Sequence, residues 1–258
     1  MSRFKATVAY DGTGFAGFQR QMNAPRTVQG ELEAVLTRFN GGEFVGVHGS
    51  GRTDAGVHAL GQVVHFDLDD ARAVERIRFA LDTQTPDDIS IRELLRVSDD
   101  FHARFDKHEK IYEYRLENSA SRSPFERLTA AYFRYPLALS ALTEGLSVLA
   151  GTHDFRGFMA SGSSVENTIR TISEATVEHA NDIFIFRFRG NGFLYKQVRN
   201  MVGTLIKIGA GKFPVSRIAE ILATGNRALA GPTAAPEGLY LKEVIYTGGK
   251  FSPEDYKK

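Results

Sequence analysis

Short runs in which apolar and polar residues alternate recur along the whole chain, and they constrain its fold more than any other feature. Near the start, every second residue is apolar or aromatic: Phe4, Ala6, Val8 and Tyr10. This period is typical of a β-strand with one buried face. Further strands are predicted at 62–68, 87–97, 111–116, 129–137, 171–179, 183–190 and 239–246. A fold rich in β-structure is therefore expected.

Helical periodicity appears in both halves of the chain. The stretch 28–39 has apolar residues on one helical face, and Thr27 before it is a suitable N-cap. Other helices are predicted at 71–80, at a segment capped by Ser140, at 194–209 and at 217–225. The strands and helices follow one another like a strand–helix–strand unit repeated with variation. This order predicts an α+β fold of two similar halves with a mostly antiparallel sheet.

The boundary between the halves is expected near the basic and aromatic stretch that follows Asp99. We place the N-terminal half at 1–104 and the C-terminal half at 105–258. Because no Pro-, Gly- or Ser-rich linker separates them, the halves are expected to be packed together. The polar tail 251–258 is expected to be frayed.

Composition limits the classes of function. The chain has 258 residues, 42% of them hydrophobic, which is enough for a substantial core. It contains no cysteine, so disulfides, thiolate catalysis and cysteine-ligated metal sites are excluded. No signal-peptide core and no membrane-spanning apolar run is evident, which favours a cytoplasmic protein without membrane association. The net charge of +1 neither demands nor excludes a nucleic-acid partner.

The stretch GSGRTDAGVHALGQ, residues 49–62, places a lone acid beside an arginine in a glycine-rich loop. It lacks the pattern of a phosphate-binding P-loop, and a strand follows it, whereas a helix follows a dinucleotide-binding loop. Asp54 with His58 supplies only two metal ligands, which is a weak metal signal. Arg52 can hold Asp54 ionised or bind a phosphate. The local pattern leaves an ordinary turn and a functional acid equally open.

Basic residues gather beside aromatic ones in FHARFDKHEKIYEYR, residues 101–115. This composition fits a solvated strand edge with core aromatics, or a groove that follows a nucleic-acid backbone and stacks bases. In the predicted helix 194–209, Lys196 and Arg199 are three residues apart and are expected on one face. Near the start, the loop DGTGFAGFQRQ carries two aromatics, Phe15 and Phe18, that are expected to be exposed.

Together these motifs resemble those of the tRNA pseudouridine synthase A family. The resemblance rests on GRTDAGVHA, GQVVHF, DDFHARF, the K-x-Y-x-Y of Lys110 to Tyr114, VRNMVG and EGLYLKEV, in this order. It implies two ferredoxin-like halves whose sheets join across a central catalytic cleft, and a homodimer that binds tRNA across both subunits. It implies isomerisation of uridine to pseudouridine at positions 38, 39 and 40 of the anticodon stem-loop. It implies no cofactor and no metal.

The resemblance also assigns roles to single residues. Asp54 becomes the carboxylate that attacks the base, attacks the sugar or removes a sugar proton. Arg199 is the first choice for the cation that keeps it ionised, and Arg52 is the second. Arg52 also suits the extrusion of the target base. Tyr112 is expected to stack on the uracil, and Leu241 to line its pocket. Phosphate contacts are expected from Arg20, Arg104, Lys107, Lys110 and Lys196.

Two other classes of function fit parts of the sequence. A catalytically silent RNA-binding protein on the same scaffold would use the basic residues and would not need Asp54. A metal-dependent hydrolase would use Asp54, His58 and His65, although no recognisable ligand set surrounds His65.

Overall fold

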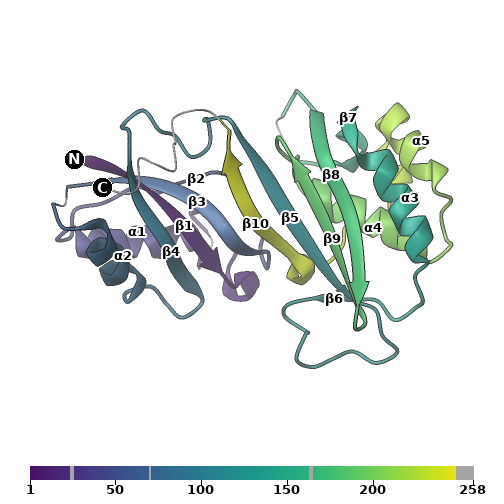
Figure 1. The fold of residues 1–258 in the computed structure, drawn as a ribbon, viewed down its shortest axis with the longest axis horizontal. Helices are drawn as coiled ribbons and strands as arrows, with labels where there is room; N and C mark the ends of the chain where they lie inside the picture. Colours follow the sequence, from purple (N-terminus) through teal and green to yellow (C-terminus); the bar gives the residue numbers. More distant parts are fainter. Residues whose placement is uncertain (24–25, 70, 163–164, 248–258) are drawn as a thin grey trace. The chain divides into compact units, whose positions relative to one another are not determined.

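The computed structural model of the chain describes residues 1–23, 26–69, 71–162 and 165–247. Its strands form a mostly antiparallel sheet, accompanied by five α-helices among the described residues (Figure 1). The predicted α+β class is therefore confirmed. The α-helices are α1 (Val28–Phe39), α2 (Val74–Asp82), α3 (Leu139–Leu149), α4 (Gln197–Gly209) and α5 (Ser216–Thr224). None of the described helices is long and apolar enough to cross a bilayer. The expectation for the tail 251–258 lies outside the described residues.

The chain divides into two compact units. Unit 1 comprises Met1–His108 and the described part of Leu241–Lys258, and unit 2 comprises Glu109–Tyr240. The predicted division at 104/105 falls slightly earlier and assigns the last strand to the second half. From Leu241 on, the last strand belongs to unit 1, where the Tyr246 hydroxyl donates a hydrogen bond to the carbonyl of Ala103 at 2.7 Å.

Unit 1 has a β-α-β-β-α-β order. Its strands are β1 (Ser2–Tyr10), β2 (His48–Gly49), β3 (His58–Leu68), β4 (Ile89–Val97) and most of β10 (Leu239–Tyr246). Helix α1 follows β1, and α2 precedes β4. The order β4-β1-β3-β2, with antiparallel neighbours, is that of a ferredoxin-like unit.

The two faces of the unit 1 sheet differ in their surroundings. Phe4 pairs with Phe66 across β1 and β3, and both side chains are buried in the core. The next pair along the strands, Lys5 and His65, points to the opposite face because side chains alternate along a strand. Figure 1 shows α1 and α2 on one face of this sheet.

The caps of the unit 1 helices agree in part with the sequence. The Thr27 hydroxyl accepts a hydrogen bond from the Gly30 amide at 3.2 Å, which confirms the predicted N-cap of α1. Helix α2 begins at Val74, later than the predicted residue 71, and its N-cap Ala73 supplies no side-chain hydrogen bond.

Unit 2 has a similar arrangement. Its strands are β5 (His108–Glu117, nearly all in this unit), β6 (Ala131–Tyr132), β7 (Gly151–Asp154), β8 (Ile169–Ala180) and β9 (Ile183–Gly190), in the order β5-β9-β8-β7. The predicted hairpin of β8 and β9 is confirmed. Asn181 and Asp182 form its tip with φ values of 49° and 64°, as a tight turn between twisted strands requires.

Three local predictions in unit 2 were wrong. Of the stretch 129–137, only Ala131–Tyr132 forms a strand. The Asn118 side-chain amide donates hydrogen bonds to the carbonyls of Phe133 and Tyr135, at 2.6 and 2.8 Å, in place of a strand partner. Helix α3 begins before Ser140, at Leu139, so this serine does not cap it. Helix α4 begins only at Gln197.

Candidate active site

The loop that carries Asp54 connects β2 to β3 and contains a closed turn. The Val57 amide donates to the Asp54 carbonyl at 3.2 Å, which closes four residues. Gly56, the third residue of this turn, has a φ of 75°, which side-chain-bearing residues rarely adopt. The turn therefore fixes the backbone at Asp54, whose side chain is half-buried.

The loop after β1 holds this turn from one side. The Thr53 carbonyl accepts a hydrogen bond from the Phe18 amide at 3.1 Å, and the Thr53 hydroxyl lies 2.8 Å from that of Tyr10. At Gly17, with a φ of 102°, a Cβ would come within 2.8 Å of the Thr53 carbonyl oxygen. Close backbone approach thus explains a glycine in the first loop.

The two aromatics of the first loop are buried, and the prediction that they are exposed was wrong. Phe15 and Phe18 expose 4% and 1% of their surface. The Phe18 ring occupies the space beside Gly49, where a Cβ would come within 2.5 Å of it. The Arg26 guanidinium covers Phe15, 4.2 Å from the ring centroid. Residues distant in sequence create both contacts, so the local pattern did not reveal them.

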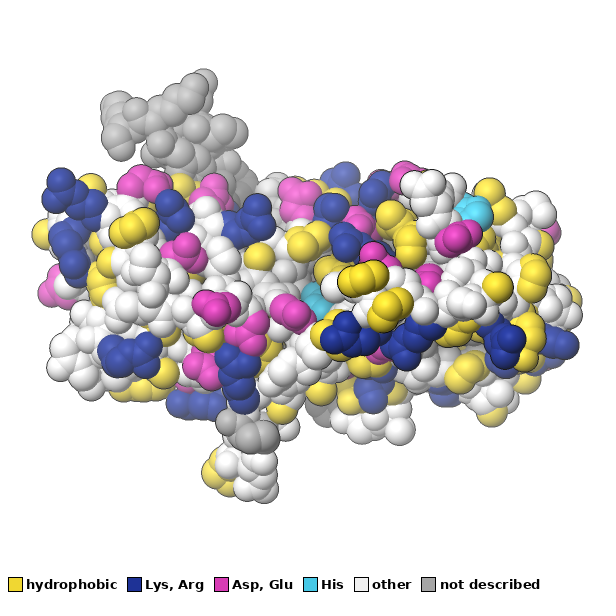
Figure 2. Space-filling view, turned by 90° about the horizontal axis from the view of Figure 1, so that it is seen from below, with side chains coloured by type: hydrophobic (Ala, Val, Ile, Leu, Met, Phe, Trp, Pro, Cys, Tyr) yellow, Lys and Arg dark blue, Asp and Glu magenta, His cyan; other side chains and the backbone are white. Residues whose placement is uncertain are grey.

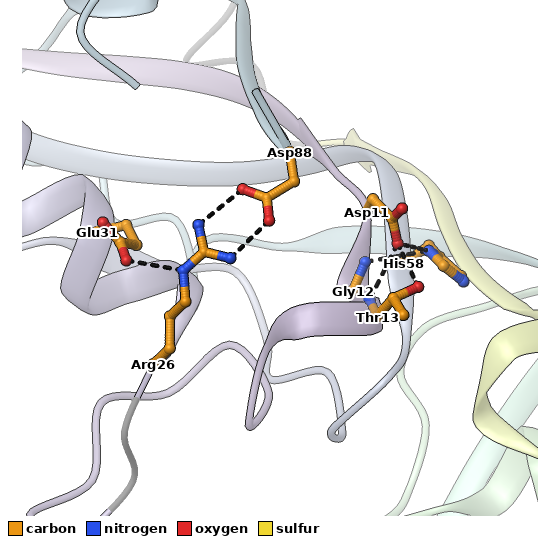
Figure 3. Close-up of polar contacts among 7 residues, drawn as sticks. All are labelled: Asp11, Gly12, Thr13, Arg26, Glu31, His58 and Asp88. Atoms are coloured by element: carbon orange, nitrogen blue, oxygen red, sulfur yellow. Dashed lines mark hydrogen bonds and ion pairs between the residues drawn. The ribbon is translucent and has the colours of Figure 1, made fainter. Parts of the chain in front are cut away.

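A polar cluster connects the start of the loop after β1 to the first residue of β3 (Figure 3). The Gly12 amide donates to Nδ1 of His58 at 3.1 Å, and this nitrogen lies equally far from the Asp11 carboxylate. The same carboxylate accepts from the amide and hydroxyl of Thr13, at 3.0 and 2.6 Å. Burial alone would raise the pKa of Asp11, but the Thr13 hydrogen bonds and His58 outweigh burial and lower it.

Most of the other predicted site residues of unit 1 lie on its surface. Arg52 shares the loop of Asp54 and donates through Nε to Gln19 at 3.1 Å. Arg20 forms an ion pair with Glu33 at 3.0 Å. The remaining three are Arg104 and Lys107, which are exposed on the segment before β5, and Leu241, which is only 1% exposed in β10.

In unit 2, Tyr112 lies midway along β5, two residues after Lys110. Its ring meets the Phe193 ring edge to face, at 5.1 Å between centroids, and is 9% exposed. Tyr114, two residues further, is fully buried and donates through its hydroxyl to the Ala235 carbonyl at 2.9 Å. Burial raises the pKa of Tyr114 above its usual range.

Arg199 lies in the first turn of α4 and is tied to the loop 231–235. Its Nε donates to the Ala234 carbonyl at 2.8 Å, and the Ala234 amide donates back to the Arg199 carbonyl at 3.1 Å. Lys196 does not share the helix with Arg199, contrary to the prediction. It is the N-cap, with a left-handed φ of 56°, and its ammonium lies 4.9 Å from the Tyr195 ring centroid.

Asn200 organises the surroundings of Arg199, and sequence reasoning missed this role. It is fully buried and donates through Nδ2 to the Phe158 carbonyl at 2.7 Å. Its Oδ1 accepts from the Thr233 hydroxyl at 2.7 Å and from Arg227 at 3.0 Å. The available signal was an amide among the apolar residues of an amphipathic helix, since buried amides are nearly always hydrogen-bonded.

The histidines considered for a metal site have structural contacts. Nδ1 of His58 and of His65 each accept a backbone amide, from Gly12 and Ala103, at 3.1 and 3.2 Å. Across the described ranges, no group of three or more His, Asp or Glu side chains is arranged to hold a metal ion. Figure 2 shows basic and acidic side chains interspersed on the face that it draws.

His65 should make the stability of the protein sensitive to acid. Burial lowers its pKa to about 4, and the nearby charges of His102, His48 and Arg3 act in the same direction. Between pH ~6.5 and 4 the unfolded chain binds a proton that the native imidazole does not, so about 3 kcal/mol of stability is lost as the pH falls. Urea unfolding at pH 7 and pH 4.5 measures this loss. A His65→Leu variant should show a flatter dependence, and an unchanged dependence would contradict the assignment.

Comparison with known proteins identifies the family. Residues 6–106 and 146–247 match the family model described as tRNA pseudouridine synthase. The chain is 62% identical to the tRNA pseudouridine synthase A of Lactococcus lactis subsp. lactis strain IL1403, over 95% of this chain and 98% of the relative. It is 57% identical to that of Streptococcus agalactiae serotype Ia and 56% identical to that of Streptococcus mutans serotype c, again over 95% of this chain and over 96% and 99% of these relatives.

The matched segments include the loop of Asp54, the helix of Arg199 and the strand of Leu241. Such a match over most of the chain, with an aspartate on a fixed loop of an α+β fold, defines an RNA-modifying enzyme. The chain belongs to the tRNA pseudouridine synthase family.

Proposed function

We propose that this protein isomerises uridine to pseudouridine at positions 38, 39 and 40 in the anticodon stem-loop of tRNA. The observation that carries the proposal is Asp54, a carboxylate fixed on a tight turn within the segment matched by the family model. A catalytically silent RNA-binding protein would have no need of this acid.

The reaction breaks the bond between C1′ of the ribose and N1 of the uracil, and forms a bond from C1′ to C5. C5 loses a proton and N1 gains one, so the product is an isomer and no redox partner is needed. Asp54 is the carboxylate that acts on the sugar or the base during cleavage.

Two arginines serve the reaction in different ways. Arg199 is our first candidate for the cation that keeps the carboxylate ionised, and its hydrogen bond to the Ala234 carbonyl gives its side chain a defined direction. Arg52 is exposed on the loop of Asp54. From there it takes the space of the extruded base or holds the adjacent phosphate, since the target base must leave its stack.

Tyr112 and Leu241 hold the uracil while it turns. An aromatic ring stacked on the base restrains it without fixing one orientation, and the Tyr112 hydroxyl can assist loss of the C5 proton. Tyr112 lies between the two segments matched by the family model, so its role rests on the K-x-Y-x-Y pattern. Leu241 supplies an apolar wall.

Binding of the RNA is led by phosphate contacts, because much of a tRNA arm is A-form helix. Affinity should fall steeply with salt if several phosphates are neutralised. The side chains proposed for this role are Arg20, Arg104, Lys107, Lys110 and Lys196. We further propose that the enzyme acts as a cytoplasmic homodimer, binds tRNA across both subunits, and uses neither a cofactor nor a metal.

Tritium release tests the proposed activity. Unmodified tRNA with tritium at uridine C5 is incubated with the protein and no added metal, and released tritium is counted. Release is expected, because the C5 proton leaves when C5 becomes bonded to C1′. If no tRNA with uridines in its anticodon arm releases tritium, the protein does not carry out this reaction.

A further inference from the structure

A row of contacting rings in unit 1, with two stacked contacts and one edge-to-face contact, plays no part in the chemistry above. It consists of His48, His65, His102 and Phe105, which we call the ring ladder. Ring centroids are 4.9 Å apart from His48 to His65, 4.5 Å from His65 to His102 and 4.2 Å from His102 to Phe105. The last pair is stacked, with 30° between the ring planes. The ladder therefore ends in an aromatic ring supported from one side.

The backbone that carries Phe105 is fixed. The amides of Phe105 and Asp106 both donate to the His102 carbonyl, at 3.2 and 3.0 Å, which forms a tight turn. Within this turn, the Ala103 amide donates to Nδ1 of His65, and the Ala103 carbonyl accepts from the Tyr246 hydroxyl. The turn is thus bonded to β3 and β10, which fixes the backbone position of Phe105.

Phe105 is 78% exposed despite this support. Single exposed apolar side chains are common on protein surfaces, and exposure alone would carry no conclusion. Phe105 differs because it is stacked on an imidazole and lies between two exposed cations in sequence, Arg104 and Lys107. Asp106, the acid next to Phe105 in the sequence, accepts a hydrogen bond from the His102 amide at 3.2 Å, within the turn.

We propose that Phe105 is a stacking site for an unpaired nucleobase of the RNA substrate, flanked by phosphate contacts from Arg104 and Lys107. This rests on the proposed function. Proteins that bind single-stranded RNA combine aromatic rings, on which bases stack, with cations that follow the backbone. A base on Phe105 extends the ring ladder by one ring. The flanking cations favour a nucleotide over an apolar protein segment as the ligand.

Filter binding of unmodified tRNA over a series of salt concentrations tests this site. Phe105→Ala should weaken binding roughly 5- to 100-fold, the range found for loss of one base–aromatic stack. The slope of affinity against salt should stay unchanged, because no charge is lost. Phe105→Tyr keeps a ring and should bind like the wild type. Arg104→Ala should instead reduce the salt slope by about one unit.

Phe79→Ala is the matched control, since Phe79 is 65% exposed on α2 in the same unit. It should leave affinity unchanged. Equal tRNA binding by Phe105→Ala and the wild type would overturn the stacking site. So would a change in sedimentation of Phe105→Ala without a change in RNA affinity, which would place the ring against a second copy of the chain. Tritium release by the same wild-type preparation separates both outcomes from failure of the proposed function.

Discussion

Asp54→Asn is expected to abolish turnover of tRNA while leaving tRNA binding largely intact. Asparagine has the shape of aspartate, so the turn closed between Asp54 and Val57 should persist. It lacks the negative charge that the proposed role of Asp54 requires, and loss of a catalytic carboxylate of this kind costs roughly 10⁴-fold or more in rate. Single-turnover tritium release with saturating enzyme measures this loss, and filter binding measures RNA affinity.

Asp69→Asn is the control for the charge change. Asp69 lies in unit 1 with its side chain 84% exposed, near the N-terminal ammonium. Its substitution should leave turnover as it is. Residual turnover by Asp54→Asn close to that of the wild type would show that another group initiates cleavage.

Gly203→Ala is expected to damage both stability and turnover, although alanine is the better helix former. At an exposed helical position the change from glycine to alanine stabilises by about 0.5–1 kcal/mol. Here a Cβ would overlap the Pro232 carbonyl oxygen. The loop 231–235 would have to shift, and with it the hydrogen bond from Arg199 to Ala234. Overpacking of this kind typically costs about 1–3 kcal/mol.

Thermal unfolding and tritium release together measure the effect. Gly46→Ala is the matched control, since its Cβ would meet only the Phe44 ring, at 3.7 Å. It should unfold like the wild type and keep full turnover. A Gly203→Ala protein more stable than the wild type would mean that the loop yields without strain, and that the loop does not fix Arg199.

The parts of the fold that the sequence predicted are those determined by neighbouring residues. The N-cap at Thr27 needs only a hydroxyl three residues before Gly30. The hairpin of β8 and β9 needs only alternating strands around Asn181 and Asp182, which accept positive φ more readily than most residues. Both are local, and both were confirmed.

The parts that the sequence did not reveal depend on residues distant in the chain. Phe18 is buried because Gly49 leaves room for its ring. Leu241 belongs to unit 1 because the end of β10 is bonded to residues before β5. The role of Asn200 depends on hydrogen bonds with Phe158 and Thr233, which lie far from it in the sequence. For the candidate site, the sequence indicated Asp54 and Arg199 as candidates. The hydrogen bonds by which neighbouring loops hold these two residues could be described only from the structure.

Analysis of the product tests the central claim most directly. Unmodified tRNA is incubated with the wild-type protein or with Asp54→Asn, digested to nucleosides and separated by chromatography. We predict that the wild type converts anticodon-arm uridine to pseudouridine, nucleoside for nucleoside and without a change in RNA mass, and that Asp54→Asn forms none. Unaltered uridine after incubation with the wild type, or equal pseudouridine from both proteins, would contradict the account.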